Sequence, residues 1–110
     1  MSAAIGAGDL HHRLTLEMPI DVADGGGGTT RTWQQLTVLW GAVRGTSGRS
    51  ATRAGSEAAS RTHDIIIRYR TDIASDMRFR LGARLFRIIA IADPDGRAAW
   101  LVCNVVEEDL

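Results

Sequence analysis

The sequence predicts an all-β protein, a small closed β-barrel of six or seven strands with one long inserted loop. In most segments apolar residues recur at every second position, which is the period of a half-buried strand. These segments are rich in Thr, Val, Ile and Trp, and clusters of Gly, Pro and Asp separate them roughly every ten residues. Short strands at that spacing favour a sheet that is closed as a barrel or stacked as a sandwich.

The first strands are expected around a glycine-rich turn. In residues 12–18 the apolar side chains share one face, and Pro19 is expected to end the strand. Residues 24–28 read Asp-Gly-Gly-Gly-Gly and predict a turn or a flexible loop, because glycine adopts positive φ without strain. Two separate strands are then expected at residues 29–33 and 36–44.

The second half of the chain contains the clearest strand, at residues 62–70, where Ile65, Ile67 and Tyr69 share a face. Gly82-Ala83 predicts a tight hairpin, and the Asp-Pro-Asp-Gly sequence of residues 93–96 predicts a β-turn. The strands that flank these turns are expected at residues 78–81, 84–92 and 98–106.

We expect the core to be built from the apolar faces of these strands. The six aromatic residues mostly alternate with apolar neighbours and are expected inside. Trp33 is the exception, because it follows Arg31 and precedes two glutamines, so it is a candidate interface residue. The expected core residues are Leu14, Leu16, Leu36, Val38, Trp40, Ile65, Ile67, Phe86, Ile88 and Ile91.

One segment, residues 45–61, breaks the strand pattern and contains no large apolar residue. It cannot contribute to a core, although residues 53–60 could form a short Ala-rich helix. A loop of this length inside a small domain is either functional or a solvated insertion. Arginines recur along it and at its start, which favours a contact function: Arg44, Arg49, Arg53 and Arg61.

The 110 residues fit a single domain spanning 1–110, and their formal charge is zero. The charge is uneven: residues 1–43 carry −2, residues 44–87 carry +6 and residues 88–110 carry −4. The basic middle could attract the acidic ends of other copies, bind a polyanion, or pair within one subunit. The acidic end includes Glu107, Glu108 and Asp109, which are candidate interface residues.

The sequence offers little catalytic chemistry, so we expect no enzyme, no cofactor and no metal. All thirteen cationic residues are arginine, which excludes a Walker-A lysine, a Schiff base and a Ser–Lys pair. The adjacent His11 and His12 would point to opposite faces of a strand, which disfavours joint ligation with His63. Cys103 lies among apolar residues and is expected in the core.

The compartment expected from these features is the cytosol. The first residues lack the pattern of a secretory signal, and the single cysteine cannot form an internal disulfide. No apolar run approaches the ~18 residues that a membrane-spanning helix needs. A small nucleic-acid-binding barrel is the alternative function, since the basic middle could contact phosphates, although the neutral whole disfavours it.

An ordered set of features resembles the phage head–tail joining family, the head-closure or stopper proteins of long-tailed phages and phage-like gene transfer agents. The features extend over most of the chain: residues 8–16 (GDLHHRLTL), 39–43 (LWGAV), 47–49 (SGR), 62–70 (THDIIIRYR) and 77–78 (MR). The resemblance implies a small barrel that forms a ring, six- or twelve-fold, in the neck of a virion or phage-like particle assembled in the bacterial cytoplasm.

The resemblance also implies partners for each side of that ring. A portal or adaptor ring lies on the head side, a tail terminator or tail tube lies on the tail side, and double-stranded DNA passes through without sequence recognition or membrane contact. The loop after the Trp-Gly-Ala-Val strand projects to seal or line the channel or to dock a neighbour. In this sequence that loop is residues 45–61, with its four arginines.

Overall fold

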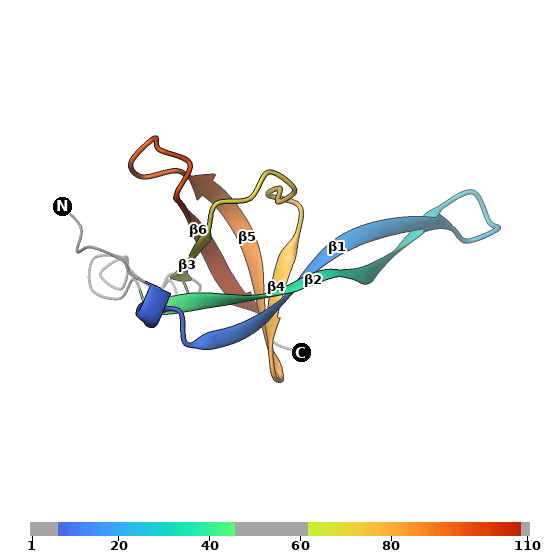
Figure 1. Cartoon of the computed structure of the whole chain (residues 1–110). Coiled ribbons are helices and arrows are strands. Elements are labelled where there is room, and N and C mark those ends of the chain that lie inside the picture. The colour runs from blue at the N-terminus through green and yellow to red at the C-terminus, as the bar shows by residue number, and fades with distance from the viewer. Residues whose placement is uncertain (1–6, 46–61, 109–110) are drawn as a thin grey trace, which may run out of the picture.

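The protein is described by a computed structural model for residues 7–45 and 62–108, and Figure 1 shows its arrangement. It is an all-β protein with one short 3-10 helix at Ala7–Asp9, so the predicted fold class is confirmed at that level. The six strands are β1 (His12–Ala23), β2 (Thr29–Gly45), β3 (Thr62–Arg68), β4 (Arg78–Leu81), β5 (Arg84–Ala92) and β6 (Trp100–Glu108).

All neighbouring strands are antiparallel, and their pairings form a ring. The order is β1-β2-β3-β6-β5-β4, and β4 pairs back onto β1 through residues 78–80 and 15–17. The predicted turn at residues 93–96 is confirmed, with Asp93 accepting hydrogen bonds from the backbone of Gly96 and Ala98. The hairpin of β4 and β5 has the predicted bounds on both sides of Gly82-Ala83.

Strand β2 is one continuous strand of 17 residues, so the prediction of two strands at 29–33 and 36–44 is wrong. The register explains why the sequence pattern is interrupted between the two predicted strands. Leu16 faces Thr37 and Glu17 faces Gln35, so Leu36 is an extra residue at a β-bulge. A bulge bends and twists its strand without ending it. The alternation therefore changes phase at Leu36 while the strand continues.

Strands β1 and β2 extend beyond the ringed sheet as a two-stranded arm, which we define as residues 18–34 (Figure 1). The prediction that the strand ends at Pro19 is wrong, because β1 runs on to Ala23. Beyond Glu17, strand β1 pairs only with β2 in the described part of the chain. Proline is tolerated there, since a missing N–H on an open edge removes no bond to a further strand.

The arm ends in the turn predicted from the glycine run. Gly25 and Gly27 have φ of 84° and 90°, a region that L side chains rarely adopt. The Asp24 side chain accepts hydrogen bonds from the backbone N–H of Gly26 at 2.8 Å and of Gly28 at 3.2 Å. These bonds lower the pKa of Asp24 and hold the turn as an Asx-type loop.

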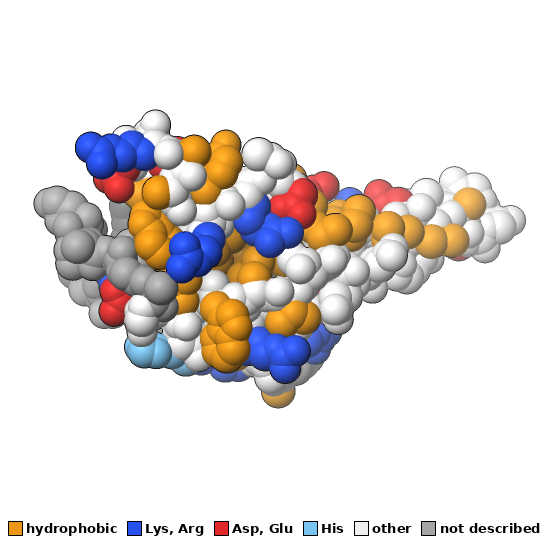
Figure 2. All heavy atoms as spheres, viewed as in Figure 1, with side chains coloured by type: hydrophobic (Ala, Val, Ile, Leu, Met, Phe, Trp, Pro, Cys, Tyr) orange, Lys and Arg blue, Asp and Glu red, His pale blue; other side chains and the backbone are white. Residues whose placement is uncertain are grey.

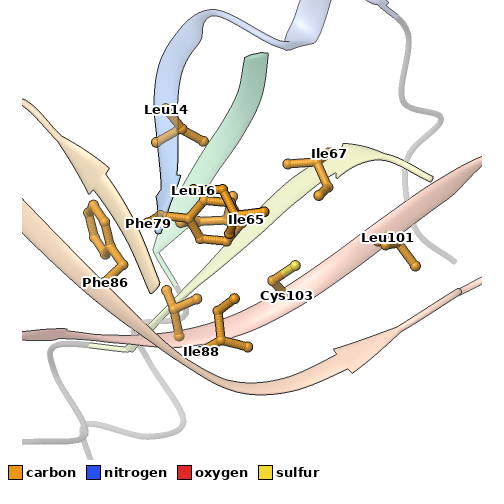
Figure 3. Close-up of a cluster of buried hydrophobic side chains, with 10 residues drawn as sticks. Leu14, Leu16, Ile65, Ile67, Phe79, Phe86, Ile88, Leu101 and Cys103 are labelled. Carbon is orange, nitrogen blue, oxygen red and sulfur yellow. The ribbon is translucent and has the colours of Figure 1, made fainter. Parts of the chain in front are cut away.

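The hydrophobic core lies inside the ringed sheet (Figure 3). Most of the expected core residues are buried there: Leu14, Leu16, Ile65, Ile67, Phe86 and Ile88, with Ile91 packed against them. Further residues complete the core: Phe79, Leu101, Cys103 and Val105. The expectation that Cys103 is a buried core residue is confirmed, because it is 0 % exposed.

Three expected core residues of β2 face outward instead: Leu36, Val38 and Trp40, of which Trp40 is 56 % exposed. From Thr37 onward the odd-numbered residues of β2 face the core, and Gly41 occupies a closely packed position among them. A Cβ built on Gly41 would lie 2.7 Å from Cδ1 of Leu14 and 3.1 Å from Cγ2 of Ile67. Both faces of β2 carry apolar residues, so periodicity alone could not decide which one is inside.

Strands β3 and β6 differ slightly from their predicted bounds. Strand β3 ends at Arg68, and Tyr69, expected on the core face, is 41 % exposed. The Tyr69 N–H still donates to the carbonyl of Ala99 at 3.0 Å, just before β6 starts at Trp100. No helix in the described ranges is long and apolar enough to cross a membrane.

Candidate interaction surfaces

The predicted arginine loop is almost entirely outside the described residues. Arg49, Arg53 and Arg61 lie there, as does Asp109 near the end of the chain. Arg44 is described: it is exposed near the end of β2, where its register partner on β3 is Asp64. It lines a hollow of about 180 Å³ together with Asp9, His11, His12, Ala42 and Val43. The roles assigned to these residues stay predictions.

Trp33, the candidate interface aromatic, is half-buried at the base of the arm. The guanidinium of Arg78 lies 4.1 Å from its ring centroid, which is cation–π distance. The ring therefore braces the base of the arm against β4 within one subunit. Its predicted contact with a partner stays a prediction.

Arg78 belongs to a charged cluster with Glu17 and Arg80 on the outside of β1 and β4. Its Nε donates to Oε1 of Glu17 at 2.6 Å, and Nε of Arg80 donates to Oε2 at 3.2 Å. Burial raises the pKa of Glu17, but the hydrogen bonds and charges of the two arginines together outweigh it, so the pKa is lowered. The pairing joins β1 to β4 at the place where the ring of strands closes.

The acidic end of the chain meets the basic middle within the same subunit. Glu107 accepts hydrogen bonds from Nε and Nη2 of Arg84 at 2.8 and 2.9 Å, and Glu108 accepts one from Nε of Arg87 at 3.0 Å. His63 lies 3.9 Å from Glu107. The sequence left open whether the basic middle attracts other copies, binds a polyanion or pairs within one subunit. For Glu107 and Glu108 the structure shows pairing within the subunit.

An apolar groove of about 390 Å³ lies where β2 and β3 leave the core, and sequence reasoning did not identify it. Leu39 and Ile67 contribute from the strands, and the exposed rings of Trp40 and Tyr69 stand beside them. The remaining lining residues are Leu10, Arg68 and Arg70. A usable signal was present: Trp40 precedes Gly41, and a glycine facing the core puts its large neighbour outside.

The arginines of the groove have partners of their own. Arg70 forms a two-bond pair with Asp72, with Nη2 2.7 Å from Oδ2, and this pairing lowers the pKa of Asp72. The guanidinium of Arg68 lies 5.3 Å from the ring centroid of Trp100. These contacts fix the polar rim around the apolar floor, which is the arrangement of a protein-binding surface.

Neither the one cysteine nor the metal-binding residue types form a reactive centre in the described structure. Burial raises the pKa of Cys103 to about 12, and the nearby negative charge of Asp64 adds to that effect, so the thiol stays protonated. Within residues 7–45 and 62–108, no group of three or more His, Cys, Asp or Glu side chains is placed to hold a metal ion. The absence of enzymatic activity stays a prediction.

The geometry defines a class of protein: a small all-β protein whose distinctive features are an apolar groove and exposed aromatic side chains. Residues 5–108 match the family described as phage head completion protein, and the chain belongs to that family. This confirms the resemblance found in the sequence.

Two solved structures are similar over nearly their whole length. One is a chain from the virion of a native gene transfer agent particle, with 34 % identity, a TM-score of 0.69, and coverage of 92 % of this chain and 97 % of that one. The other is protein SF1141 from Shigella flexneri 2a, solved in solution, with 30 % identity, a TM-score of 0.72, and coverage of 94 % and 96 %. No curated protein sequence matches the chain.

Proposed function

We propose that this protein is a structural head–tail connector, a head-closure or stopper protein of a phage or phage-like particle. The observation that carries the proposal is the family match combined with 34 % identity, over 92 % of the chain, to a chain of a gene transfer agent virion. Conserved fold alone would not specify function. Here the family and the assembled particle both point to the head region of a virion.

In this proposal the ringed sheet acts as a closed β-barrel and the protein has no enzymatic role. Several copies form a six- or twelve-fold ring in the particle neck after assembly in the bacterial cytoplasm. The portal or adaptor ring contacts the head side and a tail terminator or tail tube contacts the tail side. Double-stranded DNA passes through the channel, and Arg44, Arg49, Arg53 and Arg61 seal it, line it or dock a neighbour.

The alternative, a nucleic-acid-binding barrel, has less support. Arg84 and Arg87, which contribute to the basic middle, are paired with Glu107 and Glu108. Arg78 and Arg80 are paired with Glu17. Phosphate binding depends on cations that can release counterions from the backbone of DNA, and paired arginines contribute little to that.

The proposal is tested by deleting residues 49–60 and examining particles by electron microscopy. The deleted segment has no large apolar residue, so the chain should still fold. We expect filled heads without tails, or heads that lose their DNA. Replacing Arg44, Arg49, Arg53 and Arg61 by Gln should weaken tail joining in the same direction. Arg97→Gln, at an exposed arginine in the turn before β6, is the matched control. Normal tailed particles that retain DNA in all variants would contradict the proposal.

A further inference from the structure

The arm carries an apolar stripe that the fold itself does not use. Along β1, Leu14, Leu16, Met18, Ile20 and Val22 share one face because side chains alternate along a strand. Leu14 and Leu16 are fully buried, whereas Val22, near the tip, is 48 % exposed. The alternation of a core strand therefore continues past the core, and Figure 2 shows hydrophobic side chains along the arm.

The rest of this arm face is polar and uncharged. The cross-strand partners of Met18, Ile20 and Val22 are Gln34, Thr32 and Thr30, and cross-strand partners share a face. A face without a cation does not suit phosphate. An apolar line flanked by hydroxyl and amide groups suits the apolar surface of another protein.

The same chain has an apolar groove that could receive this stripe. The groove beside Trp40 and Tyr69 lies at the opposite end of the β1–β2 ribbon, since Trp40 pairs with Arg13 while Val22 pairs with Thr30. Nine residues of extended strand separate Arg13 from Val22, which is about 30 Å. The extended ribbon holds the stripe away from the groove of its own subunit, so for the two surfaces to meet a second copy has to supply the groove.

Charge also favours a contact between arm and groove. On the arm, Asp21 and Asp24 outnumber Arg31. Around the groove, the two lining arginines, Arg68 and Arg70, outnumber Asp72, the partner of Arg70. Both sets are at the surface, where such complementarity steers the encounter of two proteins.

We propose that Ile20 and Val22 on the arm of one copy bind in the Trp40–Tyr69 groove of the next copy. The two surfaces differ and lie at opposite ends of the ribbon, so the contact is heterologous and repeats from copy to copy. Such a contact closes into a ring when the rotation between copies is right. The inference deepens the proposed connector function and rests on it for the ring.

Site-specific crosslinking of the full chain tests this contact. The only natural cysteine, Cys103, is fully buried, so an introduced surface cysteine is the reactive thiol in each variant. Val22→Cys is mixed with Tyr69→Cys, one of the two bearing a tag that changes its size, and a short bismaleimide is added. The control partner for Val22→Cys is Ile89→Cys, which is 45 % exposed on β5 and lies outside the groove.

We expect the Val22→Cys and Tyr69→Cys mixture to give at least about tenfold more mixed dimer than the control pair. Adding Trp40→Asp to the Tyr69→Cys chain should remove this excess while leaving its thiol accessible. Equal yields for the two pairs at the highest soluble concentration would overturn the proposal, as would an excess that Trp40→Asp does not reduce.

The same cysteines in assembled particles separate this inference from the proposed function. If Val22→Cys crosslinks only to a different virion protein while particles need this chain for tail joining, the arm contact is wrong and the connector function stands. If crosslinks between copies form but particles join tails without the chain, the contact stands and the connector function is wrong.

Discussion

Gly41 shows how one absent side chain sets the cross-section of the core. Leu14 and Ile67 occupy the volume that a larger residue at this position would take. The same backbone geometry turns Trp40, its neighbour, toward solvent and so creates one wall of the groove. The close packing of the core and the wall of the groove thus depend on two consecutive residues, Gly41 and Trp40.

We expect Gly41→Ala to destabilise the protein by roughly 1–3 kcal/mol, because the added Cβ overlaps a tightly packed core. Chemical denaturation gives the free energy of unfolding directly. Gly45→Ala is the matched control on the same strand, since a Cβ there meets nothing within 4 Å. A Gly41→Ala protein as stable as the Gly45→Ala protein would contradict this account of the core.

Glu17 ties strands β1 and β4 together through Arg78 and Arg80. We expect Glu17→Gln to lower the free energy of unfolding at neutral pH by roughly 1–3 kcal/mol, because two charge-assisted hydrogen bonds are weakened. Asp21→Asn, in the exposed Arg31 pair of the arm, should change stability little and serves as the control.

The pH dependence of this effect has a definite sign. The pKa of Glu17 is lowered in the folded state from its ordinary value of 4.5, so its stabilisation is present above that value. The stabilisation is lost as the pH falls below 4.5 and through the folded-state pKa. Denaturation curves of the wild type and Glu17→Gln should therefore converge in acid, and a difference that persists unchanged at low pH would contradict the assignment.

At the scale of elements, the arm and the ringed sheet are separable parts of one ribbon. Residues 20–32 pair only with one another in the described structure, whereas the core residues of β1 are Leu14 and Leu16. The arm therefore adds exposed surface and little core. This exposed surface is the one that the proposed contact between copies would use.

We expect a variant in which Asn-Gly replaces residues 20–32 to remain folded, because this pair forms a tight hairpin between Pro19 and Trp33, which face each other in the register. Thermal unfolding should stay cooperative, with a midpoint near that of the wild type. Loss of the folded state would show instead that the arm supports the core.

The elements that were predicted correctly are those whose turns are encoded locally. Gly82-Ala83 and the glycine run after Asp24 mark their hairpins directly, because positive φ at glycine is a local requirement. The errors at Pro19 and Leu36 have a different origin. Whether a proline breaks a strand depends on whether the edge beside it is paired, and a bulge depends on the partner strand. Neither is visible in one segment alone.

The surfaces were harder to predict than the strands for a related reason. Trp40 was assigned to the core because it alternates with Val38, and the one local sign against that assignment, the glycine that follows it, was overlooked. The pairing of Glu107 and Glu108 within the subunit was left open as one of several outcomes, because their arginine partners lie on a neighbouring strand about twenty residues away in sequence. Their role at an interface stays a prediction. Pairing between strands decides both cases.

At the scale of the whole molecule, many of the opposite charges that sum to zero are also paired with each other within the subunit. The basic middle of the sequence contacts acidic residues from both ends, through Glu17 on one side and Glu107 and Glu108 on the other. Such pairing lowers the positive potential that the described surface presents to DNA. This low potential fits the proposed connector function, in which DNA would pass the protein without being held.

We expect the wild-type chain to bind free double-stranded DNA weakly, and the Glu107→Gln/Glu108→Gln variant to bind more tightly at low salt, because Arg84 and Arg87 lose their charged partners. Fluorescence anisotropy across a salt series measures the change, and added salt should remove it. The control is Asp21→Asn, which alters one acidic residue elsewhere. Equal affinity for both proteins at every salt concentration would contradict this view of the charge distribution.

The proline at position 19 has a consequence for solubility. The outer edge of β1 beyond Glu17 lacks a partner in the described structure, and open edges recruit strands from other molecules into fibrils. Pro19 interrupts this edge with a residue that cannot donate a backbone hydrogen bond, and Asp21 adds a charge two residues later. The arm can thus present its apolar face while its β1 edge resists indiscriminate polymerisation.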